Sequence, residues 1–354
     1  MTIAELEQIF TDQQAFRQLT ESIRPGSTVQ LASLVGSSLS LVAHGAIARL
    51  GGVHVLVAED RDAAGYLYND LYPLTGGEGL FFFPTGYKRS IQYGQEDPSG
   101  LVQRTTALNA LRSAADKPLI LCTYPEALTE KVADRERLSD SVLKLRRGDN
   151  LSTAFVEEAL WECRFEQVEF VYEPGQYSVR GGIVDIFSYS DNKPYRIDFF
   201  GDEIDSIRPF DVGTQLSTGT LDEVEIVPNL KTVTSVEHRV SLARFAGEVT
   251  YWIADGDYTL KRFDDIRTKI LGDLDEPSSI DTLVTSRKGF LSDAKKAAFV
   301  LLRDNVRERP AEVRVAFDTT PQPEFNKKFD LLADDINANR LRGYSTCLLS
   351  DNKA

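Results

Sequence analysis

The sequence predicts an α/β protein in which a parallel-sheet domain is interrupted by an inserted α+β domain with an antiparallel sheet. Short apolar strands, each followed by a helical pattern, occur in residues 1–142, and this α/β character returns after Asp211. Between these regions, four short segments rich in β-branched and aromatic residues are separated by tight-turn sequences, which indicates an antiparallel meander. With 354 residues and 42% hydrophobic content, the chain can form two or three cored domains.

The first part of the α/β domain is expected over residues 1–142. Its apolar residues change between helical spacing and short strand-like runs, and strands that alternate with helices predict a parallel sheet. The expected elements are a helix through Ile3, Leu6 and Phe10, a strand, loop and helix between Thr28 and Leu41, and strands at Val53–Val57 and Leu119–Thr123.

The inserted domain is expected over residues 143–220. It begins with a capped amphipathic helix at Asn150–Leu160, for which Ser152 or Thr153 is available as the N-cap. The four strands of the meander follow between Tyr172 and Asp211. The turn signals between them are Pro174-Gly175, Gly181-Gly182, Ser190–Pro194 and Gly201-Asp202.

The third strand of the meander places an aromatic residue among charged ones. Side chains alternate along a strand, so Phe200 shares a face with Arg196 and Asp198. The opposite face carries Tyr195, Ile197 and Phe199. An aromatic beside an arginine has the composition of a protein-binding hot spot. The plainer interpretation is that these residues decorate the solvent face of a small sheet.

The second part of the α/β domain is expected over residues 221–320, with strands at Val249–Ile253 and Val313–Phe317. The two parts are therefore expected to pack together. Residues 321–354 are predicted to be a linker and the truncated start of a further α/β unit. In that segment Phe325, Phe329, Leu332 and Ile336 line a helix, Gly343 caps it, and Tyr344–Leu349 is a strand.

Composition narrows the function classes. The net charge of −14 disfavours non-specific binding of nucleic acid, and the basic run Lys144, Arg146 and Arg147 is expected to be a solvated linker or helix face. No segment is long and apolar enough to span a bilayer, so a cytoplasmic protein is expected. Cysteines and histidines lack the paired spacing of a disulfide framework or a metal site. They are Cys122, Cys163, Cys347, His44, His54 and His238.

The first strand–loop–helix occupies the place of a phosphate-binding loop, which would read G-x-x-x-x-G-K-S/T. Here Ser33 and Ser38 replace the two glycines, Leu39 replaces the lysine, and Ser40 retains the hydroxyl. Leucine supplies no charge for the phosphates, so the loop is expected to be degenerate. Gly36 to Ser40 is interpreted as a tight turn into a helix, and a residual anion site at the helix start stays open.

The second nucleotide-binding element is also incomplete. The strand through Ile253 is followed by Ala254-Asp255-Gly256-Asp257, and no glutamate follows Asp255 to position water. Asp255 is therefore expected to be a loop or cap residue. No catalytic residue, metal site or cofactor is predicted for this chain.

Two segments carry a resemblance to a known family. V-R-G-G-I-V-D-I-F at Val179–Phe187 and P-Y-R-I-D-F-F-G-D-E-I-D-S-I-R at Pro194–Arg208 closely resemble the UvrB-homology module of bacterial transcription-repair coupling factors. The resemblance implies a degenerate P-loop, helicase-like domain that carries an inserted docking domain for UvrA. It also implies that Arg180, Arg196 and Phe200 contact UvrA.

The resemblance has implications for the parent protein too. Full-length members of the family continue into an RNA-polymerase-binding domain and a DNA translocase motor that uses ATP and Mg²⁺. In these proteins a C-terminal domain masks the UvrA-binding surface. Three alternatives stay open: an active nucleotide hydrolase, a UvrB-type protein that binds damaged DNA, and an interaction domain with another partner. UvrB has a tyrosine-rich hairpin, for which Tyr87–Tyr93 is too short and too lightly aromatic.

Overall fold

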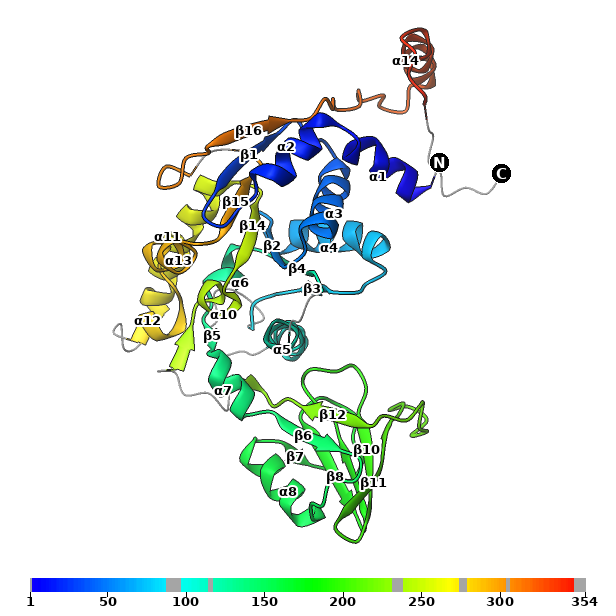
Figure 1. Ribbon diagram of the computed structural model, residues 1–354, viewed down its shortest axis with the longest axis vertical. Coiled ribbons are helices and arrows are strands. Elements are labelled where there is room, and N and C mark those ends of the chain that lie inside the picture. The colour runs from blue at the N-terminus through cyan, green and yellow to red at the C-terminus, as the bar shows by residue number, and fades with distance from the viewer. Residues whose placement is uncertain are drawn as a thin grey trace. The chain divides into compact units, whose positions relative to one another are not determined.

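A computed structural model describes residues 2–86, 97–113, 117–230, 238–273, 279–303 and 306–346. The chain forms two compact units, Met1–Phe317 and Asp318–Ala354. The larger unit contains a seven-stranded sheet, a five-stranded sheet and two small two-stranded sheets (Figure 1). The predicted fold class, a parallel-sheet domain with a separate antiparallel-rich sheet, is confirmed. The segment Tyr87–Tyr93 lies outside the described residues.

The seven-stranded sheet is parallel throughout, in the order β16-β1-β15-β14-β2-β4-β3. Strands from the second half of the chain lie between strands from the first half, because β15 and β14 separate β1 from β2. The two halves therefore build one sheet. The strands are β1 (Thr28–Ala32), β2 (Val53–Val57), β3 (Leu80–Phe82), β4 (Leu119–Thr123), β14 (Val249–Ile253), β15 (Ala298–Leu301) and β16 (Val313–Ala316).

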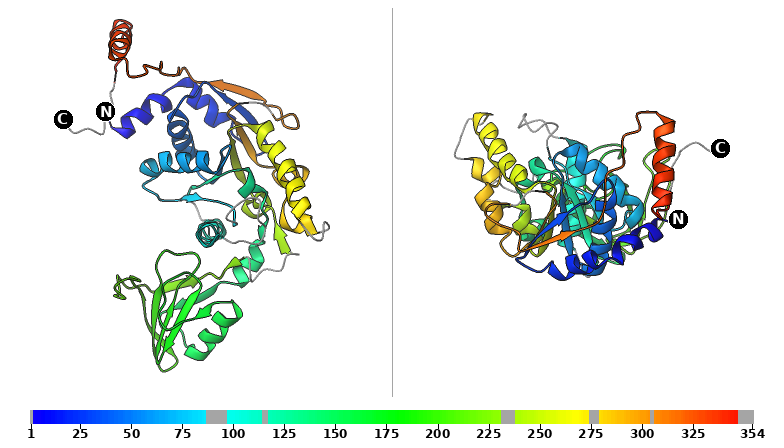
Figure 2. Two further views of the ribbon diagram at one scale, coloured as in Figure 1. Left: turned by 180° about the vertical axis from the view of Figure 1, so that it is seen from behind. Right: turned by 90° about the horizontal axis from the view of Figure 1, so that it is seen from above.

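Helices cover both faces of this sheet (Figures 1 and 2). Alternate strand residues face opposite layers: Trp252 packs with one core cluster, and its neighbour Tyr251 packs with the other. The Trp252 side is covered by α1 (Ile3–Thr11), α2 (Gln14–Ser22), α3 (Ser38–Leu50) and α4 (Arg61–Thr75). The Tyr251 side is covered by α5 (Pro98–Arg112), α6 (Pro125–Thr129), α7 (Arg135–Asp140), α10 (Leu242–Ala246), α11 (Gly256–Asp273) and α13 (Arg287–Asp293).

The five-stranded sheet has the order β11-β10-β9-β8-β7. The four strands of the predicted meander are antiparallel, and the short β7 adds a parallel edge. Its inner face packs with α8 (Thr153–Glu162), which lies against the sheet in Figure 2. The strands are β7 (Glu166–Gln167), β8 (Gln176–Arg180), β9 (Ile183–Ile186), β10 (Tyr195–Phe200) and β11 (Glu203–Pro209).

Two further strand pairs complete the larger unit. β6 (Leu143–Arg146) pairs with β12 (Glu223–Ile226), and β5 (Val132–Ala133) pairs with β13 (Arg239–Val240). A short helix, α12 (Ile280–Leu283), packs beside α11 through apolar residues. The structure corrects one prediction here: the basic run at Lys144 is a strand and not a linker or helix face, because its apolar neighbours Leu143 and Leu145 pack into the core of the inserted domain.

The smaller unit contains α14 (Phe329–Leu341). Gly343, at φ 85°, follows the helix; its N–H donates to Arg340 O, and the N–H of Tyr344 donates to Asn339 O. These are the two bonds of a Schellman cap, so the predicted role of Gly343 is confirmed. Phe325 lies before the helix, which corrects its predicted place on it. Of the predicted strand Tyr344–Leu349, residues 344–346 lie in no strand, and 347–349 are outside the described part.

Candidate docking face and the loop between β1 and α3

The outward face of the five-stranded sheet gathers charged residues on β8, β9 and β10. In the strand register, Arg196 on β10 lies opposite Asp185 on β9, and Asp198 lies opposite Ile183. Arg180, on β8, also lies opposite Ile183. Tyr195 and Ile197 point the other way and are buried in the core of this domain. The predicted alternation of β10 is confirmed.

Asp185 joins the two arginines of this face. Its carboxylate accepts hydrogen bonds from Arg196 Nε at 2.8 Å and Arg196 Nη2 at 2.9 Å, which is a bidentate geometry. Arg180 Nη2 makes an ion pair with the same carboxylate. The Asp185 side chain is only 1% exposed, whereas Arg196 is 18% and Arg180 is 37% exposed. Asp185 was not predicted as a site residue, although a lone acid in the apolar strand I-V-D-I was a usable signal.

Each arginine also stacks on an aromatic ring. The guanidinium carbon of Arg196 lies 4.7 Å from the ring centre of Phe210, and that of Arg180 lies 5.1 Å from Phe170. Each arginine also donates one N–H to a backbone carbonyl. Arg196 donates to Gln215 O at 3.2 Å, and Arg180 donates to Glu169 O at 3.0 Å. The hydrogen bond to Asp185 raises the pKa of Arg196 above its ordinary value.

Phe200 stands at the end of β10, opposite Glu203 in the β10–β11 hairpin. Its side chain is 84% exposed, which is unusual for so large an apolar group. The turn beside it uses Gly201 at φ 63°, a conformation that suits glycine. Phe200 is therefore an uncovered aromatic on the same face as the paired arginines. The contact of all three residues with a partner stays a prediction.

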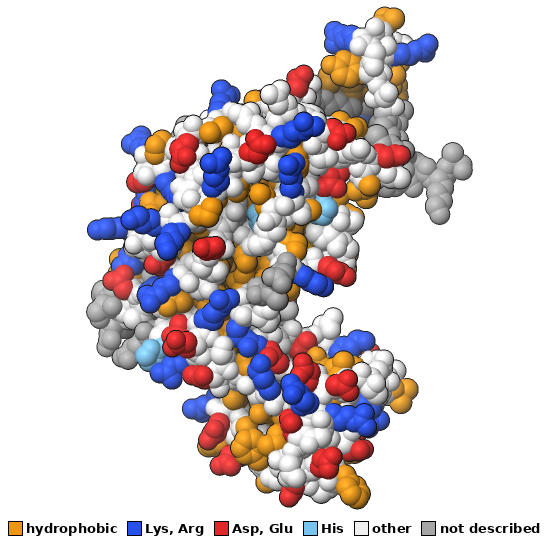
Figure 3. All heavy atoms as spheres, viewed as in Figure 1, with side chains coloured by type: hydrophobic (Ala, Val, Ile, Leu, Met, Phe, Trp, Pro, Cys, Tyr) orange, Lys and Arg blue, Asp and Glu red, His pale blue; other side chains and the backbone are white. Residues whose placement is uncertain are grey.

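The basic run before the meander is paired with acidic and carbonyl groups. Lys144 Nζ lies 2.8 Å from a carboxylate oxygen of Glu225, and Arg146 Nη2 lies 2.9 Å from one of Glu223. The Nε of Arg147 donates to Asp205 O at 3.0 Å. Figure 3 shows basic and acidic side chains interspersed over the visible face. The run therefore forms no free cationic patch.

The loop between β1 and α3 closes on itself. The hydroxyl of Ser38 donates to Val35 O and accepts from Val35 N, both at 2.8 Å. Ser33 and Gly36 have positive φ values of 60° and 58°. The helix begins at Ser38, as the interpretation of a tight turn into a helix predicted.

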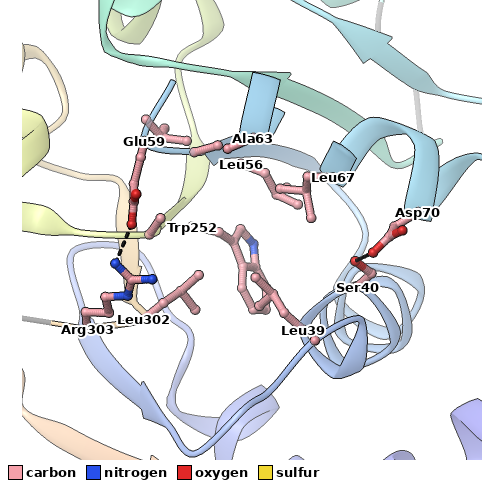
Figure 4. A pocket seen from close by; sticks show the side chains of 14 residues that line it. Leu39, Ser40, Leu56, Glu59, Ala63, Leu67, Asp70, Trp252, Leu302 and Arg303 are labelled. Atoms are coloured by element: carbon pink, nitrogen blue, oxygen red, sulfur yellow. Dashed lines mark hydrogen bonds and ion pairs between the residues drawn. The ribbon is translucent and has the colours of Figure 1, made fainter. Parts of the chain in front are cut away.

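A cavity of about 310 Å³ lies at the carboxyl ends of β2, β14 and β15, beside this loop. Figure 4 shows Leu39 pointing from α3 into it, toward Trp252. Arg303 is a cation of the lining, and it makes an ion pair with Glu59. Ser40 donates to Asp70 at 3.2 Å. The apolar residues of the lining include Leu39, Leu56, Ala63, Leu67, Trp252 and Leu302.

Asp255, the residue predicted at the place of a second nucleotide-binding element, has a structural partner. Asp255 follows β14, and its Oδ1 accepts a hydrogen bond from the N–H of Tyr258 at 2.9 Å. This bond satisfies an N–H in the first turn of α11, which is the work of an N-cap. The carboxylate therefore serves the helix start in this structure.

Among the described residues, Cys122 and Cys163 are free thiols. Cys122 is fully buried, and burial raises the pKa of its thiol; Cys163 is half-buried, and its pKa is raised for the same reason. Cys347 is outside those residues.

No helix in the described ranges is both long and apolar enough to cross a membrane. In the same ranges, His, Cys, Asp and Glu form no group of three that could hold a metal ion.

Comparisons with known proteins match one segment of the chain to a domain family and about two thirds of it to repair proteins. Residues 143–231 match the UvrB interaction domain. The chain is 29% identical over 234 residues to a transcription-repair-coupling factor of Myxococcus xanthus. The aligned segment covers 63% of this chain and 19% of that protein. It is 27% identical over 253 residues to the UvrABC system protein B of Streptococcus suis, covering 67% of this chain and 38% of that protein.

These comparisons confirm the resemblance to transcription-repair coupling factors and to UvrB. The chain spans 19% to 38% of the length of these relatives. Arg180, Asp185, Arg196 and Phe200 all lie within the segment that matches the UvrB interaction domain.

Proposed function

We propose that this chain is a UvrA-recruiting adaptor module of a transcription-repair coupling factor, and that it acts in nucleotide excision repair of DNA. The observation that carries the proposal is the match of residues 143–231 to the UvrB interaction domain. In that segment Arg180 and Arg196 share the carboxylate of Asp185, and Phe200 stands exposed on the same strand as Arg196.

The module extends over two α/β parts, residues 1–142 and 221–320, with the docking domain at 143–220. Val224 and Ile226 of β12 also pack in the core of the docking domain. Residues 321–354 are its linker and the start of a further unit.

The docking mechanism combines an apolar anchor with oriented cations. Phe200 enters a pocket on UvrA and excludes water around it. Arg180, the more exposed arginine, makes charge-assisted hydrogen bonds with an acidic group of UvrA. Arg196 is mostly covered, and it contacts UvrA from a position that its ion pair with Asp185 fixes.

The chain itself does not hydrolyse ATP. Three observations support this part of the proposal: Leu39 replaces the lysine that would reach the phosphates, the cavity beside it is largely apolar, and Asp255 caps α11. In the parent protein, ATP and Mg²⁺ belong to a separate DNA translocase motor that displaces stalled RNA polymerase. A C-terminal domain of the parent masks the docking face until the motor engages.

The test is the binding of purified UvrA to this chain by calorimetry, with Arg180→Ala, Arg196→Ala and Phe200→Ala as variants. Each variant is expected to lose roughly 1 kcal/mol or more of binding free energy. Phe155→Ala is the matched control, because Phe155 is an exposed aromatic on α8, which packs on the opposite face of the sheet. If the wild-type chain does not bind UvrA, the proposal is rejected.

The similarity to UvrABC system protein B favours one alternative, a UvrB-like domain that binds nucleotide or damaged DNA. Such a domain would gain thermal stability from ATP, or would bind damaged duplex with an affinity that falls steeply with salt. Either result, without UvrA binding, would select the alternative.

A further inference from the structure

We propose that Asp185 is the positioning residue of the docking face: its single buried carboxylate orients the guanidinium groups of both Arg180 and Arg196 toward the partner. This inference rests on the proposed UvrA docking. Asp185 is too deeply buried to contact a partner, so it acts only through the two arginines.

The strand register explains how one residue serves two arginines. β9 lies between β8 and β10, and Asp185 projects from the middle strand on the outward face. Arg196 lies directly opposite on β10. Arg180 lies on β8, two residues beyond Ser178, which is the direct partner of Asp185. A diagonal neighbour at this spacing is within reach of a long side chain. The carboxylate thus bridges two strands on either side of its own.

The two arginines use different guanidinium nitrogens to contact Asp185 and the backbone carbonyls. Arg196 presents the edge of its guanidinium, Nε and Nη2, to the two oxygens of Asp185, and Gln215 O takes a bond from Nη1. Arg180 uses one nitrogen, Nη2, for Asp185 and another, Nη1, for Glu169 O. Stacking on Phe210 and Phe170 fixes the planes of the two groups. A rigid guanidinium loses less entropy when it binds a carboxylate than a freely rotating one does.

The charges of this cluster also limit what it binds. Two arginines and one aspartate leave a net charge of +1. Without Asp185, two cations would share one site unpaired, and mutual repulsion would drive them into solvent. With it, the cluster carries one unneutralised positive charge. Asp198, on the same face, is paired with Arg208, and Glu203 lies opposite Phe200. The complementary feature on UvrA is a single acidic side chain next to an apolar pocket.

The test uses the full chain with Asp185→Asn, which keeps the shape of the side chain and removes its charge. We expect the affinity for UvrA to fall about tenfold or more, as for loss of an interface anchor. The free chain should also show altered Nε–H NMR signals of Arg196, because its acceptor has lost its charge. Glu126→Gln is the matched control: it removes a carboxylate from an arginine, Arg262, in the α/β domain, and should bind UvrA as the wild type does.

Arg196→Lys is the second variant, in case Asp185→Asn does not fold. Lysine keeps the charge but cannot form the bidentate pair, so affinity should again fall about tenfold. Wild-type affinity in either folded variant would overturn the role of Asp185 while leaving UvrA docking intact. Wild-type chain that does not bind UvrA at all would instead overturn the docking function, and this inference with it.

Discussion

The indole of Trp252 donates a hydrogen bond to Nδ1 of His54, at 3.1 Å, between adjacent strands of the parallel sheet. The other ring nitrogen of His54, Nε2, lies 2.9 Å from Gly51 O, so it carries the proton and donates. Both residues are buried. The imidazole is therefore held in one neutral tautomer, and a second proton would have to displace the indole.

This pair makes the stability of the chain depend on pH. Burial lowers the pKa of His54 from 6.5 to about 4. The unfolded chain then binds a proton more readily than the folded one, so the stabilisation is complete above pH 6.5 and is lost as pH falls toward 4. We expect the free energy of unfolding to drop by about 2 kcal/mol between about pH 7.5 and about pH 5 from this residue.

Urea denaturation at the two pH values measures this loss, with His54→Gln as the comparison. Glutamine can both donate and accept but does not titrate, so the variant should show a smaller drop than the wild type. Equal drops would exclude His54 as the source.

Phe200→Ala should separate binding from stability. Because Phe200 is exposed, its removal should change the free energy of unfolding by no more than about 0.5 kcal/mol. Arg196→Ala leaves the buried Asp185 with one cation fewer, and should cost about 1–3 kcal/mol. Thermal melts of both variants measure the difference. A large destabilisation by Phe200→Ala would mean that the ring packs against the domain in solution.

ATP with Mg²⁺ should not raise the melting temperature of this chain, because Leu39 and the apolar cavity offer the phosphates no unpaired cation among the lining residues. Differential scanning fluorimetry with millimolar nucleotide measures the shift, and an active UvrB serves as the positive control. A clear shift that is abolished by Arg303→Ala would show that the cavity accepts nucleotide.

Ser152→Ala should destabilise the inserted domain by about 1 kcal/mol, because the Ser152 hydroxyl accepts a hydrogen bond from Phe155 N at the start of α8. Thr153→Ala is the control, since Thr153 is already the first residue of the helix. The melting temperatures of the two variants decide which one caps α8. A larger loss for Thr153→Ala would contradict the assignment.

Local patterns predicted much of the fold. β2, β4 and β14 have the expected bounds, because each is a run of five residues, four of them apolar, with turn signals beside it. Two strands of the same sheet were not predicted. β3, Leu80–Phe82, has only three residues, and β15, Ala298–Leu301, has four consecutive apolar residues that show no alternation.

The sequence by itself determined that Phe200 shares a face with Arg196, because alternation belongs to a single strand and needs no knowledge of its neighbours. It also predicted that Leu39 stands where a phosphate-binding lysine would. Only the tertiary structure decided that Asp185 holds Arg180 and Arg196 together, and that β14 and β15 lie between β1 and β2. Strand order and register are set by the packing of whole faces, so residues distant in sequence meet only once the sheet has formed.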